Sequence, residues 1–392
     1  MMKLYKSEIP KQISDFAKEF NFEALRPYYD SESGEVMKRI AYHDSYHKAM
    51  AYLWPDMDKE AAIKKALSIT SPYEFQTEYM SDAIWKIVNS TSTGLTWSGL
   101  EHLDKNKSYL YIANHRDILL DSAILQIILD KEEFETSEIT FGSNLMDQGF
   151  ITDFGRMNRM FTVKREGNVK ELYDISRQLS AYIRHTILDK NVSVWIAQRN
   201  GRTKDGNDLT QTGLLKMLNM SGGKDFKKSF SELNIVPLTI SFEYEPCDAL
   251  KVQELYLSSL HTKYVKAPGE DLNSILTGIQ QPKGKIHVAF GTPIQKELEE
   301  IDKASNENEK IKVLTAYVDK QIHQNYKLNA VNYIAYDLLN QTNLFETNYS
   351  AYEKEAFLNY LQVKINALSG EAEVLKHLFI TLYANPVINK LS

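Results

Sequence analysis

The chain of 392 residues is long enough for one large domain with appendages or for two domains. Apolar residues make up 43% and charged residues 25%, a balance that is typical of a folded globular protein and excludes a disordered one. The net charge of −6 argues against a nucleic-acid partner, because nucleic-acid-binding domains carry a strong basic excess. The single cysteine, Cys247, excludes an intramolecular disulfide and favours a reducing compartment.

The sequence gives no sign of secretion or of a membrane-spanning helix. The N-terminal residues contain no apolar signal-peptide core. No stretch reaches the ~18 to 20 apolar residues that a spanning helix needs, and the best run, residues 118–129, is interrupted by polar side chains. We therefore expect a cytoplasmic protein whose contact with the inner face of the cell membrane is peripheral.

Residues 1–93 predict a helical N-terminal region. Ser71 and Pro72 have the order of an N-cap followed by the first helical residue, so we expect a helix that runs through Trp85 and Val88.

Residues 94–294 change to short β-rich runs that alternate with helical stretches. Between the runs, apolar residues recur at three and four positions from Leu172 to Ile187, which is typical of an amphipathic helix. The pattern predicts an α/β domain with helices on both faces of a sheet, in which ligands bind beyond the strand ends. The candidate strands are 94–97, 108–113, 139–142, 160–163, 192–197, 235–242 and 285–290.

Residues 295–392 predict a helical C-terminal region. Apolar residues from Ile311 to Ile322 share one helix face, and residues 352–368 predict another helix.

One predicted strand-to-helix junction carries a histidine and two carboxylates. The strand ends at Ala113, and Asn114, His115, Arg116 and Asp117 form a polar turn before an apolar helix that contains Asp121. Neutral imidazole can accept the proton of an attacking hydroxyl, and a carboxylate on the other ring nitrogen would fix its tautomer. The alternative is a solvated turn histidine beside a capping aspartate.

Asn114-His115 followed by Asp121 resembles the first block of the glycerolipid acyltransferase superfamily, which reads N-H-x4-D. Asp121 lies one residue too far from His115 for that pattern, and Asp117 lies too near. We favour an arrangement in which Asp121 pairs with the imidazole and Asp117 caps the helix over the reverse. The resemblance implies that His115 with Asp121 or Asp117 is catalytic, and we expect Asn114 and Arg116 to contact substrate.

Later segments resemble the other blocks in the family's order. The segment that ends in Lys164 and Arg165 resembles the second block, whose arginine binds the acceptor's phosphate. Asn200, Gly201 and Arg202 resemble the third block, with Asn200 or Gln198 in place of the family's glutamate. These residues are therefore expected to bind substrate, and the glutamate position keeps a hydrogen-bonding side chain but loses a negative charge.

Residues 235–241 resemble the fourth block, an apolar strand with an internal proline. Pro237 cannot donate a ladder hydrogen bond, so we expect a sheet edge or a bulge there.

The resemblance covers residues 94–294 and implies a mixed sheet flanked by helices. It implies transfer of a fatty acyl group from acyl-CoA or acyl carrier protein to a lysophospholipid hydroxyl, foremost that of 1-acylglycerol 3-phosphate. Glycerol 3-phosphate or a lyso-aminolipid could be the acceptor instead. A non-catalytic homologue that binds lipid or acyl carrier is the alternative from another class. We expect no cofactor and no metal.

Overall fold

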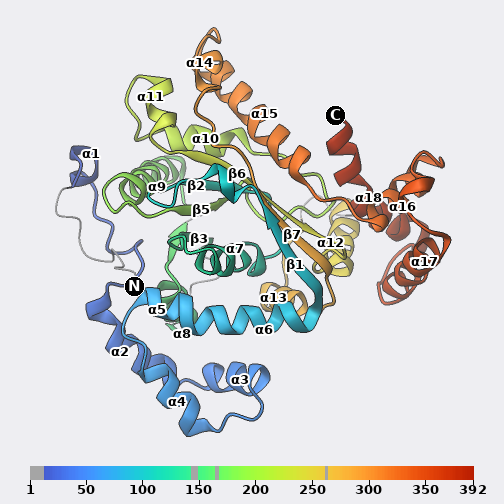
Figure 1. Cartoon of the computed structure of the whole chain (residues 1–392), viewed down its shortest axis with the longest axis horizontal. Helices are drawn as coiled ribbons and strands as arrows, with labels where there is room; N and C mark the ends of the chain where they lie inside the picture. The colour runs from blue at the N-terminus through green and yellow to red at the C-terminus, as the bar shows by residue number, and fades with distance from the viewer. Residues whose placement is uncertain (1–12, 143–148, 164–166, 261–263) are drawn as a thin grey trace.

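The computed structural model describes residues 13–142, 149–163, 167–260 and 264–392, and it has the predicted α/β fold with helical extensions (Figure 1). Its sheet has seven strands in the order β1-β7-β6-β2-β5-β3-β4. β6 and β7 are antiparallel and the other neighbours are parallel, so the sheet is mixed, as expected.

Each of the predicted strands is present, with ends displaced by at most two residues. The strands are β1 (Ser92–Ser98), β2 (Leu110–Ala113), β3 (Glu138–Gly142), β4 (Met160–Val163), β5 (Val194–Ala197), β6 (Ile235–Phe242) and β7 (Gly284–Phe290).

Helices precede, connect and follow these strands, as the sequence predicts. Before the sheet lie α1 (Asp15–Lys18), α2 (Asp30–Ala41), α3 (Asp44–Leu53), α4 (Lys59–Leu67), α5 (Pro72–Glu74), a π-helix (Phe75–Met80) and α6 (Ser81–Thr91). Between the strands lie a short 3-10 helix (Leu100–His102), α7 (Leu120–Lys131), α8 (Gly149–Met157), α9 (Val169–Leu188), α10 (Thr212–Asn219), α11 (Phe226–Ser231), α12 (Asp248–Leu260) and α13 (Glu270–Gln280). After the sheet lie α14 (Leu298–Ile301), α15 (Glu307–Asn325), α16 (Ala330–Asn340), a 3-10 helix (Glu346–Asn348), α17 (Ala351–Asn366) and α18 (Ala372–Leu391).

The central strand β2 is buried on both faces, and its side chains alternate between two cores. Tyr111 and Ala113 join the core that includes α6 and α7, whereas Leu110 and Ile112 join the core that includes α9 and α15. This alternation follows from the two-residue period of a strand. Helices therefore cover both faces of the sheet, with α6, α7 and α13 on one side and α9, α10 and α15 on the other (Figure 1).

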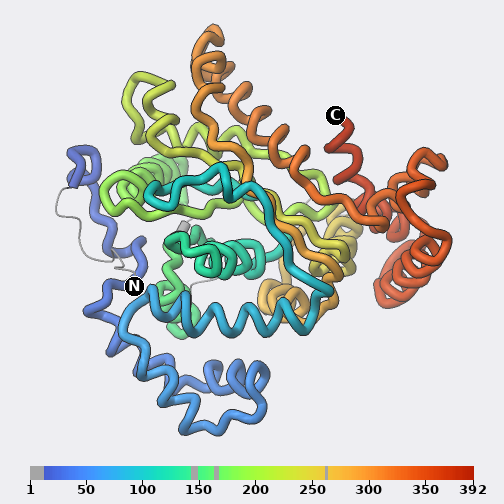
Figure 2. Tube along the Cα trace, viewed as in Figure 1, coloured from blue at the N-terminus to red at the C-terminus, as the bar shows by residue number. Residues whose placement is uncertain are grey.

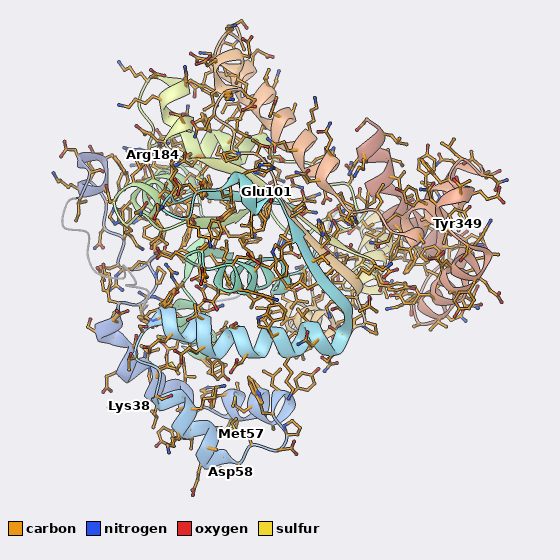
Figure 3. The ribbon with its side chains drawn as sticks, viewed as in Figure 1. Lys38, Met57, Asp58, Glu101, Arg184 and Tyr349 are labelled. Carbon is orange, nitrogen blue, oxygen red and sulfur yellow. The ribbon has the colours of Figure 1, made fainter. Side chains whose placement is uncertain are left out.

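The two helical ends lie on different sides of the sheet (Figure 2). In Figure 3, Lys38, Met57 and Asp58 mark the N-terminal helices, and Tyr349 marks the C-terminal helices on another side of the molecule. Within the N-terminal region, α2 packs against α4, and it also contacts α8 of the central region. The domain boundaries at residues 93 and 294 stay predictions. No helix in the described ranges is long and apolar enough to cross a membrane.

The expectation of a sheet edge or bulge at Pro237 is wrong. β6 lies inside the sheet between β2 and β7. The Pro237 carbonyl accepts a hydrogen bond from the backbone N–H of Gly291, just beyond the last residue of β7. A strand residue presents its N and its O to the same side, so the missing N–H of Pro237 faces the point where the antiparallel pairing ends. An internal strand accommodates the proline without breaking the ladder.

Candidate active site

The turn between β2 and α7 is fixed by the carboxylate of Asp117. One oxygen of this side chain accepts hydrogen bonds from the backbone N–H groups of Leu119 (2.9 Å) and Leu120 (2.8 Å). These donors have no partner inside the helix, so Asp117 satisfies the start of α7. Asp117 therefore supports the start of the helix, but it lies two residues before the N-cap position, which Leu119 occupies.

His115 pairs with Asp121, the arrangement that we favoured from the sequence. Its Nδ1 lies 2.9 Å from Oδ2 of Asp121, which is on the first turn of α7. The same Oδ2 accepts the backbone N–H groups of Arg116 (2.6 Å) and Asp117 (2.9 Å). The backbone thus wraps around the Asp121 carboxylate, and the additional residue relative to N-H-x4-D is accommodated within this turn.

The Asp121 carboxylate is more deeply buried than the His115 imidazole with which it pairs. The His115 side chain is 14% exposed, whereas that of Asp121 is 1% exposed. Burial raises the pKa of Asp121 to about 7, and the N–H groups of Asp117 and Arg116 oppose the rise. Burial also raises the pKa of Asp117, helped by the charge of Asp121 and opposed by the Arg202 guanidinium. The ring of Trp195 meets the His115 ring edge-on at 6.0 Å and limits its movement.

The expectation that Asn114 contacts substrate is wrong. Its Oδ1 accepts the N–H of Ile240 (2.8 Å), and its Nδ2 donates to the carbonyl of Ile240 (3.0 Å) and to Asp208 (3.1 Å). The side chain is fully buried and ties the end of β2 to β6 in the manner of a backbone pair. Asn114 therefore positions the turn.

The expectation for Arg116 is wrong for a similar reason. Its guanidinium is fully buried and donates to Asp208 (2.5 Å), to Glu245 (3.1 Å) and to the carbonyl of Gly206 (3.2 Å). The side chain points away from the cavity and forms an ionic network behind the turn. A buried charge needs such partners, since an unpaired one is costly.

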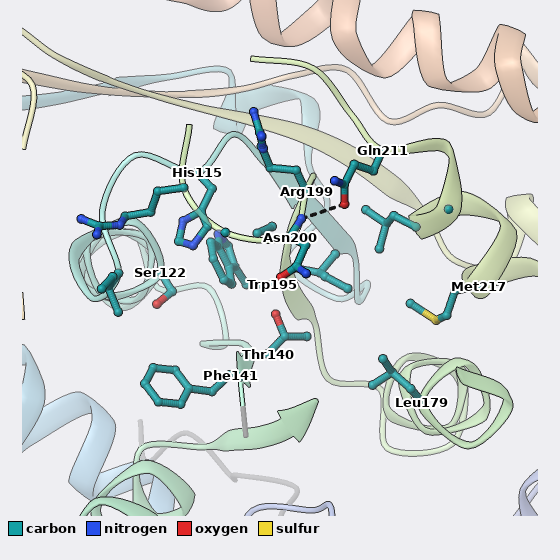
Figure 4. A pocket seen from close by; sticks show the side chains of 18 of the residues that line it. His115, Ser122, Thr140, Phe141, Leu179, Trp195, Arg199, Asn200, Gln211 and Met217 are labelled. Carbon is teal, nitrogen blue, oxygen red and sulfur yellow. Dashed lines mark hydrogen bonds between the residues drawn. The ribbon is translucent and has the colours of Figure 1, made fainter. Parts of the chain in front are cut away.

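His115 opens into a cavity of about 440 Å³ at the carboxyl ends of β2, β3 and β5. β2 and β5 are hydrogen-bonded neighbours, so the loops that follow them face each other across the cavity. In Figure 4, His115, Asn200 and Trp195 lie close together, whereas Leu179 and Met217 form another wall.

The residues that resemble the third block line this cavity, and their contact with substrate stays a prediction. Asn200, Gly201 and Arg202 all border the cavity. The backbone N–H of Asn200 donates to Gln211 (2.9 Å), the contact drawn in Figure 4, and Gly201 has φ +74°, a conformation that favours glycine. Gln198, the other candidate for the glutamate position, is fully buried and does not line the cavity.

The cavity has a cationic part and an apolar part. Arg202 is 5% exposed, and its Nη1 has no hydrogen-bond partner within the described ranges. Arg199, Lys204 and Lys266 also line the cavity, and Lys204 is paired with Glu254 at 2.5 Å. Burial lowers the pKa of Lys204 to about 8. The apolar part is lined by Ile118, Phe141, Ile175, Leu179, Leu214 and Met217.

Lys164 and Arg165 lie outside the described residues, so their predicted contact with phosphate stays a prediction.

Residues 94–241 match the family model described as Acyltransferase. The matched residues carry an acyltransferase domain. Comparison with curated protein sequences gives no match. Among solved structures, the chain is similar to the 1-acyl-sn-glycerophosphate (LPA) acyltransferase PlsC from Thermotoga maritima, at 13% identity and a TM-score of 0.39. That match covers 75% of this chain and 94% of PlsC.

Sequence reasoning missed several residues of the candidate site. Trp195 stands in an apolar strand, and only the sheet brings it to His115. Lys266 precedes α13 and carries no local signal that links it to the cavity. Within the described ranges, no group of three or more His, Cys, Asp or Glu side chains is arranged to hold a metal ion.

Proposed function

We propose that this acyltransferase moves a fatty acyl group from acyl-CoA or acyl carrier protein to the hydroxyl of 1-acylglycerol 3-phosphate, with His115 as general base. The observation that carries the proposal is the His115–Asp121 pair at the border of a cavity with a cationic and an apolar part. Neither a cofactor nor a metal is required, because the donor thioester is itself a substrate.

The proposed chemistry is direct transfer. Asp121 accepts the Nδ1–H of His115, which leaves the lone pair on Nε2 to take the proton of the acceptor hydroxyl. The hydroxyl oxygen bonds to the thioester carbonyl carbon, the C–S bond breaks, and the thiolate leaves with the proton from the imidazolium. Positioned proton transfer contributes ~10² to 10⁴ in rate. Holding both reactants in line adds to this.

The cavity suits an anionic head with an apolar tail. A planar guanidinium can donate two hydrogen bonds to phosphate oxygens, and Arg202 has an unpartnered nitrogen there among the described residues. The wall that includes Leu179 and Met217 can take acyl chain. We further propose that the protein works at the cytoplasmic side and meets its lipid acceptor by peripheral contact with the inner face of the cell membrane.

Glycerol 3-phosphate and a lyso-aminolipid remain alternative acceptors, because both present a hydroxyl to the same base. A non-catalytic homologue that binds lipid or acyl carrier is the alternative of another class. The His115–Asp121 hydrogen bond at the cavity favours catalysis over this alternative.

The test is an assay of labelled acyl-CoA and acyl carrier protein against these three acceptors. We expect transfer to 1-acylglycerol 3-phosphate, and we expect His115→Ala to reduce turnover by ~10² to 10⁴. The matched control is His377→Ala on the exposed face of α18, which should retain activity. Full turnover by a folded His115→Ala would reject the base. Binding without transfer for every donor and acceptor pair would support the non-catalytic alternative.

A further inference from the structure

A buried lysine outside the family blocks contacts the catalytic turn. Lys251 lies on α12, beyond the matched residues 94–241, and is 1% exposed. Its Nζ is 2.6 Å from the carbonyl oxygen of Arg116 and 2.5 Å from Oε1 of Glu245. Burying an ammonium group so completely costs desolvation free energy, and these two contacts offset that cost. One of them is made to the backbone of the turn itself.

The carbonyl that Lys251 holds belongs to a peptide group that also binds Asp121. The C=O of Arg116 accepts from Lys251, and the N–H of the same peptide group, on Asp117, donates to Asp121 Oδ2 at 2.9 Å. A charged donor on the carbonyl polarises the peptide and strengthens the hydrogen bond that its N–H donates. A chain of hydrogen bonds therefore runs from Lys251 through this peptide and Asp121 to His115.

The neighbouring peptide group is held in the same way at both ends. Its carbonyl, on His115, accepts the backbone N–H of Thr203 at 2.9 Å. Its N–H, on Arg116, donates to Asp121 at 2.6 Å. Thr203 and Lys251 thus fix the two peptides of the turn from outside.

We propose that Lys251 is a positioning residue for the acyl transfer: through the Arg116–Asp117 peptide it holds the Asp121 carboxylate against His115. The inference rests on the proposed role of His115.

The charges around Asp121 set the direction of the expected effect. His115 and Asp117 face it from the turn, Lys251 from α12 and Glu245 from the loop before α12. The charge of Lys251 lowers the pKa of Asp121, whereas Glu245 raises it.

Two further cations belong to these surroundings. Arg202 acts on Asp117, and Arg116 is paired with Glu245 and Asp208. Loss of the Lys251 charge leaves the effect of Glu245 less compensated, so the pKa of Asp121 rises.

The experiment compares three variants in the full-length chain by the pH profile of acyl transfer. Lys251→Met should lower kcat about tenfold or more while the acceptor KM changes little, because no substrate contact is lost. Its acid limb should move upward by roughly one pH unit. Lys251→Gln keeps a donor for the Arg116 carbonyl without the charge and should show the same shift in the limb. Lys251→Arg keeps the charge and should restore the position of the limb.

The matched control is Lys190→Met, which removes another buried ammonium, one that pairs with Glu138 at the start of β3. It should lower the melting temperature and leave the acid limb in place. If Lys251→Met does not fold, Lys251→Gln decides. A folded Met or Gln variant with the wild-type limb and kcat would overturn the proposal. When His115→Ala is inactive in the same assay, a wild-type profile of the Lys251 variants rejects the role of Lys251 and leaves the proposed function standing. An active His115→Ala rejects the proposed function instead.

Discussion

At the scale of single residues, the turn after β2 gives two neighbouring carboxylates different work. One oxygen of Asp117 accepts hydrogen bonds from the backbone N–H groups at the start of α7. Asp121 gathers two backbone N–H groups and the imidazole on a single oxygen. Both side chains are buried, and Asp121 pairs with His115, so its protonation bears directly on the proposed base.

The first residue-scale prediction concerns pH. Because burial raises the pKa of Asp121 to about 7, this carboxyl is protonated below that pH and can no longer accept the Nδ1–H or stabilise an imidazolium. His115 must also be neutral to act as a base, so both groups lose function as the pH falls. We expect kcat/KM to decline below about pH 7. The apparent pKa of this decline belongs to the His115–Asp121 pair and not to either residue alone.

Asp121→Asn tests the same carboxylate directly and should lower kcat by ~10² to 10⁴. Asp82→Asn on the exposed side of α6 is the control and should behave as wild type. An acid limb near the ordinary aspartate value of about 4 would contradict the role of burial.

The second residue-scale prediction concerns Arg202. Arg202→Ala should raise the acceptor KM by ~10 to 100-fold, since a hydrogen bond to a charged group contributes ~1.5 to 3 kcal/mol. The donor KM should change far less. Arg202→Lys keeps the charge but loses the planar fork and should be intermediate. Arg177→Ala, half exposed on α9, is the control. Equal changes in both Michaelis constants would refute the assignment to the acceptor.

At the scale of elements, α13 approaches the turn after β2 most closely at Gly278, where an added Cβ would displace a neighbouring side chain. A Cβ on Gly278 would lie 2.2 Å from Oδ2 of Asp117. That carboxylate also accepts the N–H of Leu120 at the start of α7, so α13 and α7 meet at this side chain.

Gly278→Ala should therefore destabilise the protein by ~1 to 3 kcal/mol through overpacking, and it should lower activity by displacing Asp117. Gly34→Ala is the matched control, because its Cβ would meet no atom within 4 Å on the exposed side of α2. This second change should stabilise by ~0.5 to 1 kcal/mol. Chemical denaturation measures both, and an unaltered midpoint for Gly278→Ala would show that α13 yields easily.

At the scale of the whole molecule, the C-terminal helices are joined to the element that carries Lys251. Asp248, the first residue of α12, accepts hydrogen bonds from Tyr360 (2.6 Å), Lys364 (2.9 Å) and Tyr383 (2.9 Å). The hydroxyl of Tyr383 also accepts the N–H of Glu245 at 3.0 Å. The C-terminal region thereby supports the buried network behind the active site.

Tyr383→Phe should lower the free energy of unfolding by ~1 to 3 kcal/mol, because it removes a buried donor from Asp248 and leaves the N–H of Glu245 without this acceptor. Tyr352→Phe, on a side chain that is 79% exposed, should stay within ~0.5 kcal/mol of wild type. Denaturation followed by tyrosine and tryptophan fluorescence distinguishes the two. A neutral Tyr383→Phe would mean that the Tyr383 hydroxyl does not contribute to holding the C-terminal helices on α12.

The sequence by itself determined the elements of the fold and the place of the chemistry. The seven strands, the amphipathic α9 and the polar turn at His115 follow from short-range periodicity and from the change from apolar to polar residues at Ala113. Such signals lie within a few consecutive residues, so they can be read from the sequence without knowledge of the tertiary contacts. The sequence favoured Asp121 over Asp117 as the partner of His115 but could not decide between them. The turn has one residue more than the family pattern, and the conformation of that residue depends on its tertiary surroundings.

Only the tertiary structure decided which polar groups face the cavity and which face the interior. Asn114 and Arg116 are the sequence neighbours of His115, yet both side chains bind partners in the interior. Asn114 is hydrogen-bonded to β6, and Arg116 is paired with Asp208 and Glu245. Lys251 reaches the turn from more than a hundred residues away. A chain's local pattern carries no information about such distant partners, and it is their hydrogen bonds and charges that assign each buried group its role.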